Sequence, residues 1–167
     1  MIELMFQGAT LGALYGLIGA GLALNFGILR VVNLAHGEFI TLGAFMAVGL
    51  VAAQAALPLP LVLAGAFVGC AVLGALMQVA FVERATAFRD PMVAMLVTFG
   101  LAVMIRNGLL ETLGANLRGL DVGGLAQARI EVGGQSFGLL PLVTLGIAGA
   151  AFAALAALIF RTRFGRE

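Results

Sequence analysis

The sequence predicts an all-α integral membrane protein, a polytopic bundle of about five transmembrane helices. Of its 167 residues, 62% are apolar and 10% are charged, whereas soluble domains carry about 25% charged residues. The formal net charge is only +1. A soluble chain with so little polar surface would associate and precipitate. Composition therefore excludes an ordinary soluble enzyme, a basic nucleic-acid binder and a disordered segment.

Missing residue types narrow the chemistry further. All nine basic residues are arginine, so a P-loop, which requires a lysine, is excluded. The chain has one cysteine, Cys70, and one histidine, His36, which excludes an internal disulfide and a cysteine- or histidine-rich metal site. We therefore expect a protein that is not an enzyme and binds no metal or cofactor itself.

Runs without charged residues define the helices in chain order. These runs are 4–29, 39–82, 91–105 and 132–160. Because a helix needs roughly 20 residues to cross ~30 Å of hydrocarbon, the second run is long enough for two crossings. Pro58 and Pro60 divide it, since proline is poorly tolerated inside a helix. The expected helices are 5–29, 38–57, 61–82, 91–113 and 139–160.

Residues 114–138 form the one substantial segment expected outside the membrane. Arg129-Ile130-Glu131-Val132 alternates polar and apolar residues and precedes the turn signal Gly133-Gly134. Gln135-Ser136-Phe137 follows that turn. This pattern predicts a short β-hairpin.

The distribution of arginine predicts the orientation. Cytoplasmic loops carry an excess of positive charge. With five crossings, one side holds Arg30, Arg84, Arg89, Arg161, Arg163 and Arg166, and the other holds Arg118 and Arg129. Six against two places the C-terminus in the cytoplasm and the N-terminus outside. The first apolar run is too long for a cleaved signal peptide, so we interpret it as a retained helix.

Glycines recur at helical spacing. Gly8, Gly12 and Gly16 form a small-residue ridge in the first helix, and Gly65 and Gly69 repeat the spacing in the third. Such ridges let another helix approach closely. Two interpretations stay open: tight helix packing, or a face along which helices slide.

Arg106 is the one full charge expected at membrane depth, and Asn107 follows it. Charges within a membrane are functional candidates. Arg106 lies about 15 residues beyond Pro91, or about 22 Å along the helix, close enough to the outer surface for an arginine to snorkel. Either an interfacial anchor or a place on an internal path is possible. Because no carboxylate is expected in mid-membrane, an ion-coupled carrier is disfavoured.

The segment from Asn33 to Glu38 joins two apolar helices with almost no loop and includes His36 and Gly37. One interpretation is a tight cytoplasmic turn, in which Asn33 caps a helix, Glu38 opposes its dipole and Gly37 permits an unusual backbone angle or close approach. The other is a broken or re-entrant helix near 30–38, a feature that transporters use at substrate sites and gates. Neutral polar residues within the helices, including Asn25, Gln78 and Thr98, are expected to bond between helices or to line a path.

Residues 8–47 resemble a known family, above all in the stretch Gly27-Ile28-Leu29-Arg30-Val31-Val32-Asn33-Leu34-Ala35-His36-Gly37-Glu38-Phe39. The family is the LivH-type permease subunits of branched-chain amino acid ABC importers. Thr98-Phe99-Gly100 through Arg106-Asn107 is also similar, although a neutral residue is expected at Arg106. Arg161 to Arg166 resembles the entry into the family's cytoplasmic coupling loop.

The resemblance implies a single permease domain over 1–167, truncated before the coupling loop and later helices. It also implies a bacterial inner-membrane location. The expected partners are a second homologous permease, two ATP-binding cassette subunits that hold ATP and Mg, and an external substrate-binding protein. Nucleic acid is not an expected partner. Asn33, His36, Gly37 and Glu38 would then form a gating or translocation element.

The implied activity is ATP-driven import of branched-chain amino acids by alternating access. Urea or short amides as substrates, a passive channel, and a non-functional permease fragment are the alternatives.

Overall fold

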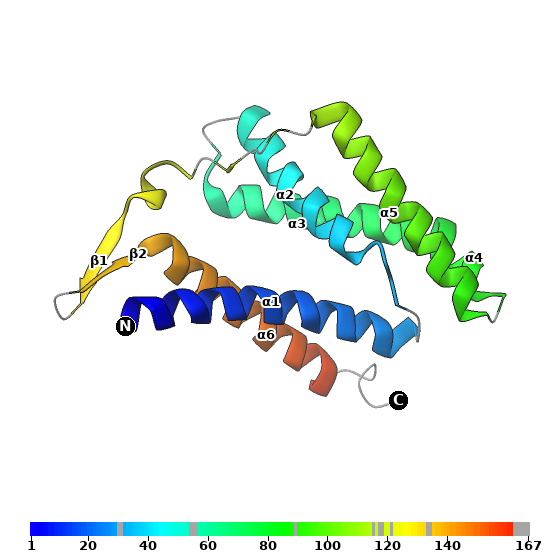
Figure 1. Cartoon of the computed structure of the whole chain (residues 1–167), viewed down its shortest axis with the longest axis horizontal. Helices are drawn as coiled ribbons and strands as arrows, with labels where there is room; N and C mark the ends of the chain where they lie inside the picture. The colour runs from blue at the N-terminus through cyan, green and yellow to red at the C-terminus, as the bar shows by residue number, and fades with distance from the viewer. Residues whose placement is uncertain are drawn as a thin grey trace. The chain divides into compact units, whose positions relative to one another are not determined.

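The chain is helical, with one short hairpin, in the computed structural model (Figure 1). The structure describes residues 1–29, 32–53, 57–88, 90–114, 116, 119–120, 122–132 and 135–161. Within these residues, five helices are long and apolar enough to cross a membrane. The predicted all-α membrane fold class is confirmed.

The helices begin and end near their predicted positions. They are α1 (Ile2–Leu29), α2 (His36–Ala53), α3 (Leu59–Met77), α4 (Glu83–Thr86), α5 (Pro91–Leu113) and α6 (Leu139–Arg161). A π-helical segment, η1 (Gln78–Val82), joins α3 to α4, so the third span covers Leu59–Thr86.

Two of the predicted boundaries are wrong. The second helix was expected to reach residue 57, but Leu57 is not helical, because the residue before a proline is disfavoured in the helical conformation. The third helix was expected to end at residue 82, yet helical backbone continues to Thr86. The fourth span begins as predicted: Asp90 accepts a hydrogen bond from the Met92 backbone N–H at 2.9 Å, and Pro91 occupies the first turn.

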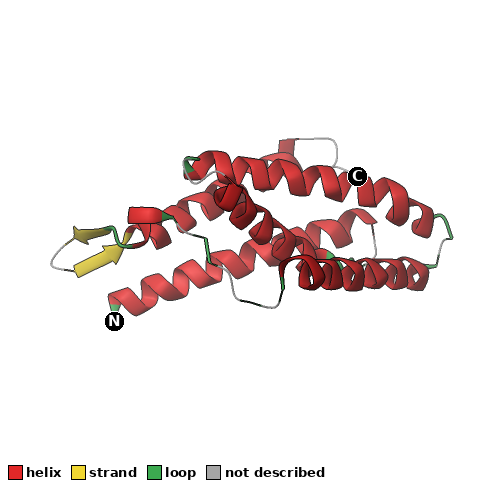
Figure 2. Cartoon of the chain, turned by 90° about the horizontal axis from the view of Figure 1, so that it is seen from above, coloured by secondary structure: helices red, strands yellow, loops and turns green. Residues whose placement is uncertain are grey.

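Contacts divide the chain into two compact units. One unit contains Met1–Ala23 and Val122–Glu167. In it, β1 (Arg129–Val132) pairs antiparallel with β2 (Gln135–Gly138), with Val132 opposite Gln135. The predicted hairpin is therefore confirmed, and Figure 2 shows it beside a short 3-10 helix, η2 (Gly123–Ala126). The rings of Phe6 and Phe137 meet edge to face, 5.3 Å between centroids.

The other unit, Leu24–Asp121, contains α2, α3 and α5. α2 and α3 run antiparallel and pack through glycines: a Cβ built on Gly65 would lie 3.0 Å from Leu50 Cδ1, and one on Gly69 would lie 3.1 Å from Met46 Sδ. Two buried clusters stabilise this unit. Their buried members are Ala47, Val62 and Ala66 in one, and Ala35, Val82 and Leu101 in the other.

Candidate functional site

A polar turn precedes α2 and is attached to α5. Within the turn, Asn33 Oδ1 accepts a hydrogen bond from the Ala35 backbone N–H at 3.0 Å, and the Asn33 carbonyl accepts one from His36 N–H at 3.2 Å. The Leu34 N–H donates to Thr98 Oγ1 at 3.3 Å. Thr98 is buried, only 1% exposed. The chain ahead of α2 is thus held against the interior of the unit.

Two neighbouring helices show how far the start of α2 lies, along the helix axes, from the turn that joins α4 to α5. His36 lines the same cavity as Gln78, and helical backbone continues from Gln78 to Thr86, about eight residues or ~12 Å farther. On α5, Thr98 lies about seven residues, or ~10 Å, beyond Pro91. Both neighbours place the start of α2 about 10–12 Å inside the level of the turn that joins α4 to α5.

That α4–α5 turn has the character of an aqueous surface. Glu83, Arg84 and Asp90 are all exposed there. If the turn lies at the membrane face, α2 begins about a third of the way through a ~30 Å hydrocarbon core. This geometry favours the broken-helix interpretation of Asn33–Glu38 over a turn at the surface.

A cavity of about 220 Å³ opens beside the polar turn. We call it the turn cavity. Its polar lining comes from three amides and one imidazole, and its apolar wall comes from the neighbouring helices. The lining residues are Asn25, Asn33, His36 and Gln78, with Ala35, Phe39, Gly74, Met77, Val82 and Leu101. None of these side chains carries a fixed charge, so the cavity suits a neutral or zwitterionic solute better than an ion.

The π-helical geometry around Gln78 was not predicted from the sequence. Gln78 opens η1, opposite the polar turn. Single π-helical turns occur frequently at functional sites. A lone amide within an otherwise apolar run was the available signal, but it does not specify local helix geometry.

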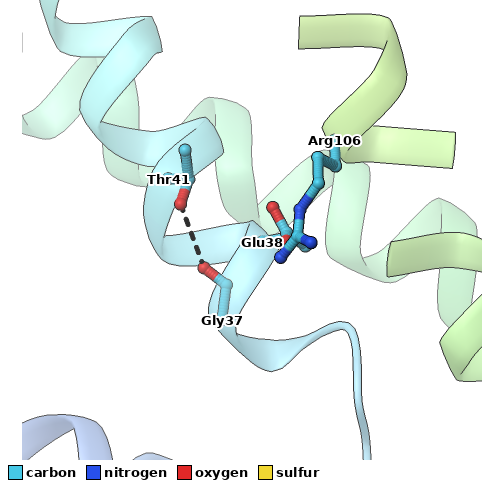
Figure 3. A network of polar contacts seen from close by, with 4 residues as sticks. All are labelled: Gly37, Glu38, Thr41 and Arg106. Atoms are coloured by element: carbon cyan, nitrogen blue, oxygen red, sulfur yellow. Dashed lines mark hydrogen bonds and ion pairs between the residues drawn. The ribbon is translucent and has the colours of Figure 1, made fainter. Parts of the chain in front are cut away.

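Glu38 and Arg106 form an ion pair that the sequence pattern does not predict. Arg106 Nη2 donates to Glu38 Oε1 at 2.5 Å, and Figure 3 shows the two side chains facing each other between α2 and α5. Glu38 lies in the first turn of α2. We expected no carboxylate at membrane depth. The inward start of α2 places the Glu38 carboxylate there, so this expectation does not fit the structure. Asn107 is exposed. It takes no part in this ion pair and is not among the residues that line the turn cavity.

Gly37 lies at the start of α2 without a close neighbour among the described residues. A Cβ built there would meet nothing within 4 Å among the described residues, and Gly37 is not among the glycines with positive φ. The expectation of an unusual backbone angle is therefore wrong. Close approach of another segment to Gly37 stays a prediction, since only the described residues of this chain are compared. Its carbonyl accepts a hydrogen bond from Thr41 Oγ1 at 3.3 Å (Figure 3).

The glycine ridge of α1 is only partly occupied. A Cβ on Gly16 would lie 3.2 Å from Phe152 Cζ of α6. A Cβ built on Gly8 or Gly12 would meet no described atom within 4 Å beyond the neighbouring turns of α1. Packing of these two glycines against another helix stays a prediction.

Several arginines on which the orientation depends lie outside the described residues. These are Arg30, Arg89, Arg118, Arg163 and Arg166. The segment that resembles the coupling-loop entry is described only at Arg161. The orientation and the docking role of this segment stay predictions.

Sequence comparison identifies relatives with a consistent set of names. The High-affinity branched-chain amino acid transport system permease protein LivH of Escherichia coli is 28% identical over 114 residues, 64% of this chain and 36% of that protein. LivH of Salmonella typhimurium is 26% identical over the same shares. BraD of Pseudomonas aeruginosa is 35% identical over 69 residues, 40% of this chain and 22% of that protein. The chain thus spans about a third of the length of the LivH relatives.

The family assignment rests on a longer match. The model of the branched-chain amino acid transport system permease component matches residues 4–167. No solved structure shows significant similarity to the chain. Since the family match covers nearly all of the sequence and the chain has five candidate membrane spans, this multi-pass membrane protein belongs to the permease components of branched-chain amino acid transport systems, which are not themselves catalytic.

Proposed function

We propose that this chain is a transmembrane subunit of an ATP-driven importer of branched-chain amino acids, and that the solute passes the turn cavity on its way to the cytoplasm. The observation that carries the proposal is the inward start of α2 beside Thr98 and Gln78, which puts polar groups next to an apolar wall inside the unit. The relatives' names supply the class of substrate.

The proposed mechanism is alternating access. ATP and Mg are bound by two partner ATPase subunits, and a second permease and an external binding protein complete the assembly. The energy of ATP binding shifts helices between two arrangements. The turn ahead of α2 takes part because its hydrogen bond to Thr98 makes it follow α5. In this proposal the C-terminus is cytoplasmic and the bacterial inner membrane is the location.

A second candidate substrate class is urea or short amides. The turn cavity presents the amides of Asn25, Asn33 and Gln78, which can donate to and accept from another amide. Its apolar wall, formed by residues such as Phe39, Met77 and Leu101, favours a solute with an aliphatic side chain. We therefore rank the branched-chain amino acids first.

The test is uptake into membrane vesicles that contain this chain, the neighbouring permease and ATPase subunits and the binding protein. ATP-dependent accumulation of radiolabelled leucine supports the proposal. Accumulation of urea in place of leucine identifies the second candidate. Equilibration of leucine without ATP indicates a passive channel. Absence of uptake with this chain, restored by a longer polypeptide that includes it, shows that these residues are part of a larger functional permease.

Within that assay, Gln78→Leu addresses the cavity directly. It removes the amide but preserves approximate side-chain volume, so we expect leucine uptake to fall about tenfold, the equivalent of one lost hydrogen bond of ~1.4 kcal/mol. Gln7→Leu removes an exposed amide elsewhere on the chain and should leave uptake unchanged. Equal uptake by both variants would exclude Gln78 from the path.

A further inference from the structure

A second cavity lies between α2 and α5, and it shares no lining residue with the turn cavity. It measures about 330 Å³. We call it the α2–α5 cavity. One acid, one base and a threonine line it together with three large apolar side chains: Glu38, Arg106, Thr41, Phe45, Leu109 and Leu110.

Arg106 uses few of its hydrogen-bond donors within the described chain. A guanidinium carries five N–H donors, and the polar contact that the structure gives this side chain is the one from Nη2 to Glu38. The Arg106 side chain is 69% exposed, whereas that of Glu38 is 12% exposed. The carboxylate is therefore largely covered, whereas most of the Arg106 side chain is exposed, and both residues line the cavity.

The depth of the Glu38–Arg106 pair determines the energetic cost of leaving the other guanidinium donors without acceptors. Arg106 lies about 22 Å along α5 from Pro91, and helical side chains lean toward the N-terminus of their helix. Its contact with Glu38, in the first turn of α2, draws the guanidinium toward the membrane interior rather than the outer surface. Outward snorkelling, the mode by which an interfacial anchor acts, is opposed by this contact. In such a setting, donors without acceptors are costly.

We propose that the α2–α5 cavity binds a solute with a carboxylate, an ammonium group and a short branched apolar side chain. The carboxylate lies on the free edge of the Arg106 guanidinium, where two parallel N–H donors match its geometry. The ammonium group lies against the Glu38 carboxylate, which has lone pairs that Arg106 leaves unused. Phe45, Leu109 and Leu110 surround the side chain.

Charge balance favours a zwitterion over a solute with one charge. Glu38 and Arg106 sum to zero, so a zwitterion keeps the occupied site neutral. A carboxylic acid anion or an amine cation would leave one uncompensated charge in a region of low dielectric, which is strongly unfavourable. This inference rests on the proposed function only for the expectation that the bound solute is then transported.

Binding is measured with the full chain in lipid nanodiscs, with radiolabelled leucine as the probe. Unlabelled leucine should displace the probe at least tenfold better than 3-methylbutanoate, which lacks the ammonium group, or 3-methylbutan-1-amine, which lacks the carboxylate. Urea should not displace it. Equal competition by the acid, the amine and leucine would overturn the proposal.

Variants test the residues separately. Arg106→Gln should weaken leucine binding at least tenfold, and Arg106→Lys should recover part of it, because the charge is kept but the planar fork is lost. Arg84→Gln removes an exposed arginine outside the cavity and should have no effect. Leu110→Trp fills the cavity while keeping the ion pair, so it should also abolish binding in a chain that still folds.

The remaining outcomes distinguish solute binding at this site from lipid binding and from solute binding in the turn cavity. If Arg106→Gln retains leucine binding and instead loses retention of anionic lipid, a lipid headgroup is the acceptor and the proposal is wrong. If binding survives Arg106→Gln and Leu110→Trp but is lost with Gln78→Leu, the turn cavity holds the solute and the proposal is also wrong. Leucine binding without ATP-dependent uptake supports this site while contradicting the proposed import function.

Discussion

The glycines of α3 and those of α1 share one sequence spacing but have different surroundings. Gly65 and Gly69 face Leu50 and Met46 so closely that an added Cβ would sit 3.0–3.1 Å from those side chains. A Cβ built on Gly8 or Gly12, also four residues apart, would meet no described atom within 4 Å beyond the neighbouring turns of α1. The difference shows that a ridge of small residues allows another helix to pack closely but does not specify which helix packs there.

The largest expected effect is at Gly65. Gly65→Leu inserts four carbon atoms where Leu50 already fills the space, and overpacking of this kind costs about 1–3 kcal/mol. We expect a lower denaturation midpoint in detergent, measured by circular dichroism. Gly8→Leu is the matched control. Equal stability of the two variants would abolish the contrast between the ridges.

Thr98→Val tests a packing contact in the unit Leu24–Asp121, which also contains the glycines of α3. The substitution leaves the part-buried Leu34 N–H without its acceptor, and loss of such a hydrogen bond costs about 0.5–1.5 kcal/mol. Thr144→Val is the control, since among the described residues Thr144 Oγ1 donates to the Leu140 carbonyl of its own helix. Urea titration of both variants should show destabilisation for Thr98→Val alone, and a similar loss in both would refute the anchoring role of Thr98.

Gly16→Leu should have an intermediate to small effect. Phe152 Cζ approaches to 3.2 Å, but a single aromatic ring at the end of a side chain can rotate away, so we expect a cost of about 0.5–1.5 kcal/mol, at the low end for overpacking. Thermal melting of the purified chain measures it. Combining the substitution with Phe152→Ala should remove the penalty, and persistence of the penalty would indicate another contact.

Gly8→Leu and Gly12→Leu should leave the chain's own stability within about 0.5–1 kcal/mol, because leucine has the higher helix propensity and open space is available. If another permease helix docks on this ridge, these variants should instead lose co-purification with the partner permease. Wild-type assembly by both would show that the ridge is not a docking face.

Gly37→Leu has the smallest expected effect on folding. Its added side chain meets open space, so membrane insertion and thermal stability should stay unchanged. We nevertheless expect loss of leucine uptake, because the position adjoins Glu38 and the inward turn, where bulk would obstruct a moving surface. Full uptake by Gly37→Leu would exclude Gly37 from gating, and Gly49→Leu, also in open space on α2, is the control.

Local signals predicted much of the fold. The charge-free runs located all five candidate spans, and Gly133-Gly134 between alternating residues predicted the hairpin that β1 and β2 form. These features depend on hydrocarbon length and turn chemistry, which neighbouring residues decide. The helix end before Pro58 and the continuation through η1 to Thr86 were missed, since backbone constraints and packing shift boundaries by several residues.

Only one part of each candidate site could be predicted from the sequence. Asn33, His36 and Glu38 were predicted as site residues because they form a cluster of polar side chains between two apolar helices. Thr98 bonds to the Leu34 N–H, Gln78 lines the same cavity as His36, and Arg106 pairs with Glu38. These residues lie between 42 and 68 positions apart in sequence, and no local pattern pairs residues across that separation.

The sequence by itself determined that this chain belongs in a bilayer, how many times it can cross and, within a few residues, where its helices lie. The reason is that the cost of placing a side chain in hydrocarbon depends on residue type, and a crossing needs about 20 apolar residues. The tertiary structure decided that α2 starts inward of the α4–α5 turn, that Glu38 neutralises Arg106, and which glycine ridge is covered. Those outcomes depend on contacts between distant segments, whose energies arise only once the helices are packed side by side.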